Sequence, residues 1–136
     1  MISKTERAYF RAAKAVSELS DHRQPIGCVV VNKHRIISSG FNSHQRVHKV
    51  QALIDNERFG VECPGRLHAE VASLLPLMRT SVDLSNATIY VYREHKDGTI
   101  AMARPCEGCL KLIRQLKIRR IRYTTDGGYA REDLEL

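Results

Sequence analysis

The spacing of hydrophobic residues along the chain predicts helices in some segments and strands in others. Between residues 5 and 19, apolar side chains recur every three or four positions with charged residues between them, which is the pattern of an amphipathic helix. Ser3 or Thr5 would cap its first turn. Residues 67–78 and 106–116 have the same spacing and are also predicted helices, although a proline near the end of the first is expected to end or kink it.

Short runs of apolar or β-branched residues predict the strands. Residues 26–31 are almost wholly apolar, as expected of a strand that is covered on both faces. Residues 32–34 read as a turn, and residues 35–40 then return as the second strand of a hairpin. Further strands are predicted at 87–93 and 118–125, where β-branched and aromatic residues gather.

Three stretches of the chain carry a weaker pattern. Residues 43–66 combine positive charge with glycine and proline, and only residues 50–54 resemble a helical turn. Residues 99–103 are expected to run back beside the strand before them, and the eleven residues after Thr125 contain no clear fifth strand. Because helices alternate with strands, we expect one α/β domain over residues 1–136, with a mixed sheet covered by helices on both sides.

The composition is that of one soluble globular domain. The chain has 136 residues, of which 43% are hydrophobic and 27% charged, and no run approaches the roughly 18 apolar residues of a membrane span. The N-terminus lacks the apolar stretch of a secretory signal, so we expect a cytoplasmic protein with reduced thiols and no membrane partner. The formal net charge of +7 favours anionic partners such as nucleotides or nucleic acid.

Four residues in two segments carry the clearest chemistry. His68 and Glu70 stand at the start of one predicted helix, and Cys106 and Cys109 form a Cys-x-x-Cys pair at the start of another. Thiolate and imidazole suit Zn²⁺, and three protein ligands leave the fourth tetrahedral position to water. Zinc lowers the pKa of such a water to about 7. Glu70, two residues from His68, would accept the water proton and return it to a leaving group.

Other roles for these four residues fit less well. A purely structural zinc site would need a fourth protein ligand, and a thioredoxin-like redox pair would leave His68 and Glu70 without a role. A non-catalytic binding module held together by zinc stays an alternative. Glu70 argues against it, because a structural zinc site needs no group that carries protons.

The spacing of the four residues is similar to that of a known enzyme family. His-x-Glu followed by Pro-Cys-x-x-Cys is the signature of zinc nucleobase deaminases, and over residues 5–128 the chain resembles the cytidine/deoxycytidylate deaminase family. Beyond the motif, the resemblance rests on residues 25–31, 40–42, 87–91 and 117–123. It implies a three-layer α/β/α cytidine-deaminase-like fold with a mixed central sheet. One catalytic zinc per chain would be bound by His68, Cys106 and Cys109, and Glu70 would move protons.

The same resemblance implies where a substrate would bind. Residues 40–42 resemble the family's substrate loop, so Asn42 would hold the sugar with Phe41 beside it, and the backbone next to Ala69 would contact the pyrimidine. Free-cytidine deaminases place a glutamate just after this asparagine, and this chain has none there. The 26 positions from Asn42 to His68 are closest to the loop length of deoxycytidylate deaminases.

The function implied is hydrolytic deamination of a cytosine nucleotide with release of ammonia, and deoxycytidylate (dCMP, giving dUMP) is the best single prediction. The partner would then be a small molecule, and we expect a homo-oligomer. A polynucleotide deaminase acting on cytosine or adenine in single-stranded DNA or RNA stays the alternative. The net charge and an additional hairpin at residues 93–104, which departs from the family pattern, both favour that alternative. A second, structural zinc at His44, His48 and Cys63 also stays open.

Overall fold

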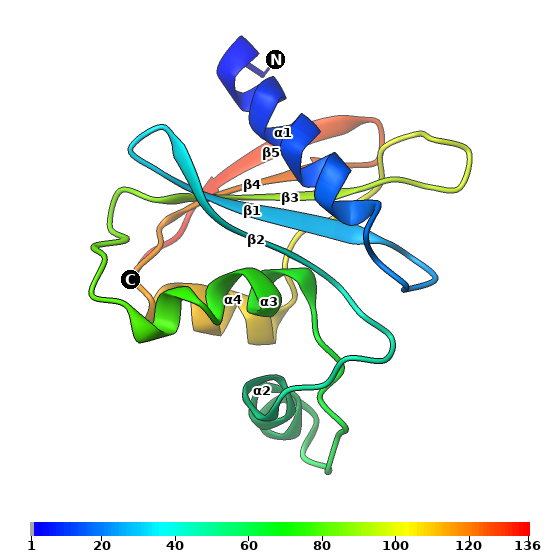
Figure 1. Ribbon diagram of the computed structural model, residues 1–136, viewed down its shortest axis with the longest axis vertical. Coiled ribbons are helices and arrows are strands. Elements are labelled where there is room, and N and C mark those ends of the chain that lie inside the picture. The colour runs from blue at the N-terminus through cyan, green and yellow to red at the C-terminus, as the bar shows by residue number, and fades with distance from the viewer. Residues whose placement is uncertain (1) are drawn as a thin grey trace.

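A five-stranded mixed sheet organises residues 2–136, the part of the chain that this computed structural model describes (Figure 1). The strands are β1 (Ile26–Asn32), β2 (Arg35–Phe41), β3 (Thr88–Arg93), β4 (Arg120–Thr125) and β5 (Gly128–Asp133). The helices are α1 (Lys4–Ser17), α2 (Lys49–Phe59), α3 (Ala69–Leu74) and α4 (Glu107–Gln115), with a 3₁₀ turn η1 (Leu77–Arg79). The strand order is β2-β1-β3-β4-β5, in which β3 and β4 are parallel and the other neighbours antiparallel.

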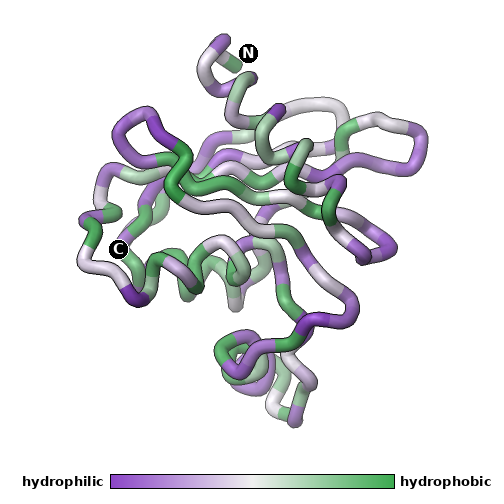
Figure 2. Tube along the Cα trace, viewed as in Figure 1, coloured by the Kyte–Doolittle hydropathy of each residue, from purple (hydrophilic) through white to green (hydrophobic). Residues whose placement is uncertain are grey.

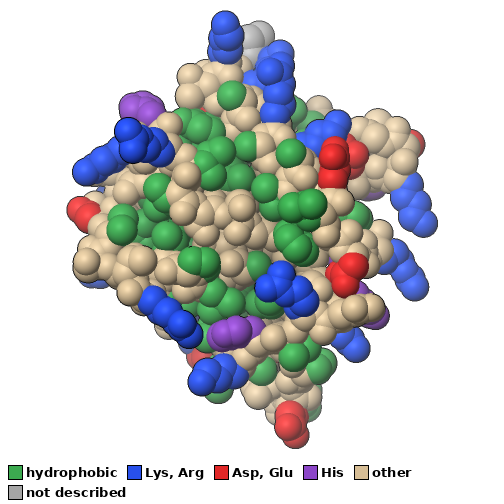
Figure 3. Space-filling model, viewed as in Figure 1, with side chains coloured by type: hydrophobic (Ala, Val, Ile, Leu, Met, Phe, Trp, Pro, Cys, Tyr) green, Lys and Arg blue, Asp and Glu red, His purple; other side chains and the backbone are tan. Residues whose placement is uncertain are grey.

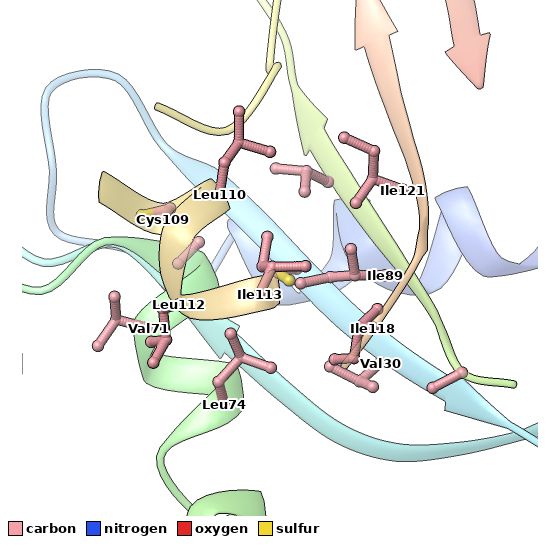
Figure 4. Packing of buried hydrophobic residues seen from close by; sticks show 14 of the residues in the cluster. Val30, Val71, Leu74, Ile89, Cys109, Leu110, Leu112, Ile113, Ile118 and Ile121 are labelled. Carbon is pink, nitrogen blue, oxygen red and sulfur yellow. The ribbon is translucent and has the colours of Figure 1, made fainter. Parts of the chain in front are cut away.

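Helices cover both faces of the sheet, which confirms the predicted three-layer α/β/α arrangement. Side chains alternate along a strand, so Tyr90 and Tyr92 of β3 pack beneath α1 while Ile89 and Val91 point to the other face. There they join the larger core cluster with α3 and α4 (Figure 4). Apolar residues follow the central strands, whereas the turns are hydrophilic (Figure 2).

Two glycines let the helices lie directly on the sheet. A Cβ at Gly27 of β1 would stand 1.9 Å from the Ala13 carbonyl oxygen of α1. On the opposite face, a Cβ at Gly40 of β2 would stand 2.4 Å from the Ser73 nitrogen of α3. Both contacts are with backbone atoms, so these helices can be this close to the sheet only where the strand has no side chain. Gly40 thereby sets the position of α3.

The helix predicted from residue 5 begins one residue earlier, and Ser3 is its cap. The Ser3 hydroxyl accepts a hydrogen bond from the Glu6 nitrogen at 3.1 Å, and the Glu6 carboxylate accepts one from the Ser3 nitrogen at 3.1 Å. This reciprocal pair satisfies two backbone groups that a helix start otherwise leaves without partners. The helix predicted at 67–78 is shorter, because α3 ends at Leu74 and Pro76 caps the 3₁₀ turn that follows.

The helical turn predicted at residues 50–54 is part of a longer helix, α2, which has eleven residues. The imidazole of His48 caps it by accepting a hydrogen bond from the Val50 nitrogen, and Gly60 ends it in a left-handed conformation with a φ of 71°. Few residues of α2 are buried, so its hydrophobic spacing is weak. It packs against α4, on the side of the α3 and α4 layer that faces away from the sheet (Figure 1).

Residues 99–103 run back beside the end of β3, as expected, but they form an isolated antiparallel bridge, between Glu94 and Ile100, and no strand. The expectation that no clear strand follows Thr125 was wrong. A fifth strand does follow Thr125. β5 is an edge strand whose residues alternate between half-buried and exposed, so it carries little of the apolar signal of a buried strand. Within residues 2–136, no helix combines the length and the apolar character needed to cross a membrane.

Candidate metal centre and active site

Two helix starts meet at the carboxyl end of β3. His68 is the N-terminal cap of α3 and Cys106 the N-terminal cap of α4. Neither side chain forms a capping hydrogen bond to its helix, so both side chains are available to another partner. Cys109 lies in the first turn of α4 and is buried. The structure therefore brings together the three residues that the sequence predicts as metal ligands.

The geometry of these three side chains fits a metal ion. The Nδ1 atom of His68 lies 3.7 Å from the Cys106 sulfur and 3.4 Å from the Cys109 sulfur. All three ligand atoms lie within 4.8 Å of one another. Two sulfurs and one imidazole nitrogen form a donor set typical of zinc, and three protein ligands are the number found at catalytic rather than structural sites. Among residues 2–136, this is the one such group of three.

The electrostatics of the centre favour a bound cation. The pKa of the Cys106 thiol is lowered to about 3, chiefly by its hydrogen bond with Cys109 and also by its bond with His68, while burial opposes the shift. The Cys109 thiol is the donor of that pair, so its pKa is raised, and burial raises it again. Bonding to Cys106 raises the pKa of His68 in turn. A lowered pKa of Cys106 favours its thiolate form, which is the form of cysteine that binds zinc.

Glu70 is the predicted proton carrier, and it lies beside the ligands without being one of their group of three. It is in the first turn of α3 and is only 5% exposed. Burial raises the pKa of its carboxyl, and the nearby positive charge of His68 opposes that shift. A raised pKa makes a carboxyl group a better acceptor of a proton, which a group that takes up and returns a proton needs. Its place and chemistry fit the predicted role.

Sequence reasoning missed a residue that positions His68. Gln51 of α2 is completely buried, and its Oε1 accepts a hydrogen bond from the His68 backbone nitrogen at 3.1 Å. The Gln51 amide then donates to Asp55 at 3.0 Å. A buried amide with both ends bonded fixes the start of α3 against α2. The only signal in the sequence is one polar residue inside the apolar stretch 50–54.

A cavity of about 340 Å³ opens over the metal centre. His68, Ala69, Glu70 and Cys106 line it together with Asn42 and residues of the hairpin at 93–104. This volume lies within the range of small-molecule sites, although near its lower end. The cavity brings the predicted metal ligands, the proton carrier and Asn42 to one place. Phe41 is not among the lining residues, and the Arg46 guanidinium stacks 5.9 Å from the centre of its ring.

Asn42 is fully engaged by the protein. Its Oδ1 accepts hydrogen bonds from the Ile26 nitrogen at 2.8 Å and the Ser20 hydroxyl at 2.7 Å, and its Nδ2 donates to the Gln24 carbonyl at 2.8 Å. These bonds tie the end of β2 to the segment before β1. Sugar contact by Asn42 stays a prediction; the second hydrogen of its Nδ2 is the group that could make it without breaking these bonds.

Three arginines contribute to the cavity wall, and none was predicted from the sequence. Arg104 is paired, since its Nε lies 2.7 Å from the Glu132 carboxylate. Arg66 and Arg93 also line the cavity, and neither forms an ion pair within residues 2–136. Arg93 donates from Nη1 to the Met102 carbonyl at 3.2 Å, while its Nε is buried and has no hydrogen-bond partner in the described chain. The cavity thus carries positive charge that the protein does not neutralise.

The predicted second metal site is not assembled. The ligand atoms of His44, His48 and Cys63 do not form a close group in residues 2–136. The ring nitrogen of His48 caps α2, and the Cys63 thiol donates to the Val61 carbonyl at 3.4 Å. The long loop therefore uses these side chains for its own structure. Cys28 is a fully buried member of the core, as its strand position predicts.

Comparisons with known proteins agree with this geometry. A model of the cytidine and deoxycytidylate deaminase zinc-binding region matches residues 3–125. A relative from Aliivibrio fischeri, described as an uncharacterized deaminase in the luxG 3′ region, is 30% identical over 122 residues. That match covers 89% of this chain and 73% of the relative.

Two solved structures share the fold. The dCMP deaminase of cyanophage S-TIM5 has a TM-score of 0.63 and 24% identity, covering 93% of this chain and 89% of that one. The cytidine deaminase of Burkholderia pseudomallei has a TM-score of 0.64 and 17% identity, covering 97% and 93%. At these identities the structural likeness concerns the fold, while the match over residues 3–125 concerns the family. The chain therefore belongs to the cytidine and deoxycytidylate deaminase family, whose members share this zinc-binding region.

Proposed function

We propose that the protein hydrolytically deaminates a cytosine nucleotide, with dCMP as the best single substrate and dUMP and ammonia as products. The observation that carries the choice of a nucleotide is the unpaired charge of Arg66 and Arg93 in the cavity over the metal centre. A guanidinium binds phosphate through charge-assisted hydrogen bonds. A nucleoside offers these arginines no anion, whereas a nucleoside monophosphate offers one.

The residues of the cavity divide the work of the reaction. Zinc, when bound by His68, Cys106 and Cys109, supplies Lewis acidity that makes water a nucleophile near neutral pH. Glu70 takes a proton on its carboxylate from the water that attacks C4 and delivers it to N3 of the pyrimidine. It then moves the proton of the new C4 hydroxyl to the exocyclic amino group, so that the C4–N bond breaks, ammonia leaves and the uracil carbonyl forms. The burial of Glu70 keeps the proton inside the cavity during this transfer. The backbone beside Ala69 faces the pyrimidine, as the family resemblance implies.

The solved structures with this fold include both a nucleotide deaminase and a nucleoside deaminase. The structural neighbour from cyanophage S-TIM5 is a dCMP deaminase that has been crystallised with dCMP and dUMP. The neighbour from Burkholderia pseudomallei is a cytidine deaminase. The substrates of these two enzymes differ in whether they carry a phosphate, and the phosphate is the group that Arg66 and Arg93 are proposed to bind.

The test is ammonia release from matched substrates by the zinc-loaded protein. We expect kcat/KM to be higher for dCMP than for deoxycytidine. Arg93→Gln and Arg66→Gln should each lower kcat/KM for dCMP by about 10- to 100-fold, since a hydrogen bond to a charged group contributes about 1.5–3 kcal/mol. The same variants should change the value for deoxycytidine less than about threefold. Arg119→Gln removes an equal charge from an exposed site outside the cavity and should change neither value.

Two results would contradict the proposal. Equal losses on dCMP and deoxycytidine would show that the arginines do not bind the phosphate. A single-stranded oligonucleotide that is deaminated faster than dCMP would favour the polynucleotide alternative. In that case log(kcat/KM) should fall with log[salt] at roughly 0.7 per contacted phosphate, which is much steeper than one phosphate can produce.

A further inference from the structure

A second cavity lies under α1, on the opposite face of the sheet from the metal centre. It has a volume of about 540 Å³ and is bounded by the start of α1, the turn between β1 and β2, and the starts of β3 and β4. It shares no lining residue with the cavity over the metal centre. The residues that matter for its chemistry are Glu6, Lys33, Tyr90, Arg120, Arg122 and Arg131. We call it the α1 cavity.

Two of the positive charges in the α1 cavity are already neutralised. Arg131 donates from Nε to the Glu6 carboxylate at 2.9 Å, and a second bond joins its Nη2 to the same group. Arg122 lies 3.7 Å from Glu6 and 3.3 Å from Asp133, and its side chain is mostly buried. Glu6 and Asp133 therefore balance Arg122 and Arg131, so the carboxylate in the cavity does not repel an incoming anion.

The other two permanent charges have no such balance. Lys33 comes from the turn after β1, and Arg120 is the first residue of β4. Both line the cavity, and neither forms an ion pair within residues 2–136. They belong to segments far apart in the sequence that the fold brings to one cavity. Asp83 lies near enough to Lys33 to feel its charge but does not line the cavity, so the cavity itself keeps a surplus of positive charge, which attracts an anion.

A tyrosine hydroxyl adds a donor of a different kind. Tyr90 of β3 lines the same cavity, and the residue as a whole is only 6% exposed. Its hydroxyl oxygen is not among the fully buried polar atoms that lack a partner, so it opens into the cavity. The phenol can therefore donate a hydrogen bond to a molecule bound there.

We propose that the α1 cavity binds a small phosphate-bearing molecule. Lys33 and Arg120 would supply the charge, and the Tyr90 hydroxyl would donate to a phosphate oxygen. A phosphate group has several acceptor oxygens in a tetrahedral arrangement, so it can accept from donors that approach from three different elements. The cavity volume lies within the range of small-molecule sites and exceeds what one phosphate group fills. This site is independent of the proposed deaminase function.

The test is titration of the zinc-loaded protein with inorganic tripolyphosphate, followed by ¹⁵N-resolved NMR and calorimetry. We expect saturable binding with shifts at the amides of Lys33, Thr88 and Arg120. Arg120→Gln and Lys33→Gln should each weaken binding about tenfold, and Tyr90→Phe should weaken it about threefold or more. Arg119→Gln is the matched control. It removes the same charge one residue away, outside the cavity lining, and should change the affinity less than about twofold.

Three outcomes would overturn the proposal. One is the absence of saturable shifts at the α1 cavity. Another is an equal effect of Arg120→Gln and Arg119→Gln, which would mean that only net charge matters. The third is a single-stranded oligonucleotide that shifts the same amides, binds more tightly than tripolyphosphate, and shows a salt dependence of four or more phosphates. The occupant would then be a polynucleotide instead of a small molecule.

Discussion

Replacing Gly40 by alanine should disturb the metal centre without touching any of its ligands. The new Cβ would lie 2.4 Å from the Ser73 nitrogen and 2.7 Å from the Ala69 carbonyl oxygen, whereas ordinary contacts begin at 3.4 Å. The backbone of α3 must therefore move away from β2 by about 1 Å. Overpacking of this kind costs about 1–3 kcal/mol of the free energy of unfolding. Because α3 carries His68 and Glu70, a displacement of about 1 Å can also lower kcat by up to about a hundredfold.

Urea unfolding and steady-state deamination measure these two effects. Gly128→Ala is the matched control, because it is the same change in a strand and its Cβ would meet only the Thr125 side-chain oxygen, at 3.2 Å. We expect Gly40→Ala to be less stable than the control by at least about 1 kcal/mol, seen as a lower urea midpoint with an unchanged slope m, and to lose activity. Equal stability and equal kcat for the two variants would refute the packing argument.

Two further predictions concern the zinc and the ion pair under α1. Cys106→Ala and Cys109→Ala should each reduce bound zinc from about one per chain to about one tenth or less, because two ligands rarely hold the ion. The control Cys63→Ala should keep about one zinc per chain, and metal analysis of the purified proteins measures the difference. Glu6 has a folded pKa held below its ordinary value, first by its hydrogen bond with Arg131, so its stabilising effect is present above about pH 4.5 and is lost as the pH falls through the folded pKa. Glu6→Gln keeps the helix cap, so the variant should be clearly less stable than the wild type at pH 7 and equally stable in acid. A difference in unfolding free energy that stays constant with pH would contradict a stabilising ion pair between Glu6 and Arg131.

Elements with a strong local signal could be predicted from the sequence. The helix at α1 has a regular apolar spacing and a serine in capping position, and the buried run of β1 is typical of a strand covered on both sides. The metal ligands were also predictable, because helix-start cysteines three residues apart must lie on one turn. Most of α2 and all of β5 were missed, because both bury few side chains and their stability comes from tertiary contacts that leave no periodic pattern in the sequence.

The rest of the site depends on which segments the fold brings together. Arg66 and Arg93 look like ordinary surface charges in the sequence, and only the tertiary structure places them over the metal centre. In the sequence Gln51 is an isolated polar residue, and only the structure shows its hydrogen bond to the His68 backbone. Conversely, His44, His48 and Cys63 have suitable chemistry for a metal but not a suitable arrangement. Homo-oligomer formation stays a prediction.

The central claim is that Glu70 transfers protons in a zinc-dependent deamination of a cytosine nucleotide. The most direct test compares dUMP formation from dCMP by the wild type and by Glu70→Gln, with zinc content measured on the same samples. We predict that Glu70→Gln folds, retains about one zinc per chain, and forms dUMP at least about a hundredfold more slowly, since a positioned acid–base group contributes about 10²–10⁴ in rate. Turnover within tenfold of the wild type in a zinc-loaded Glu70→Gln protein would contradict the account.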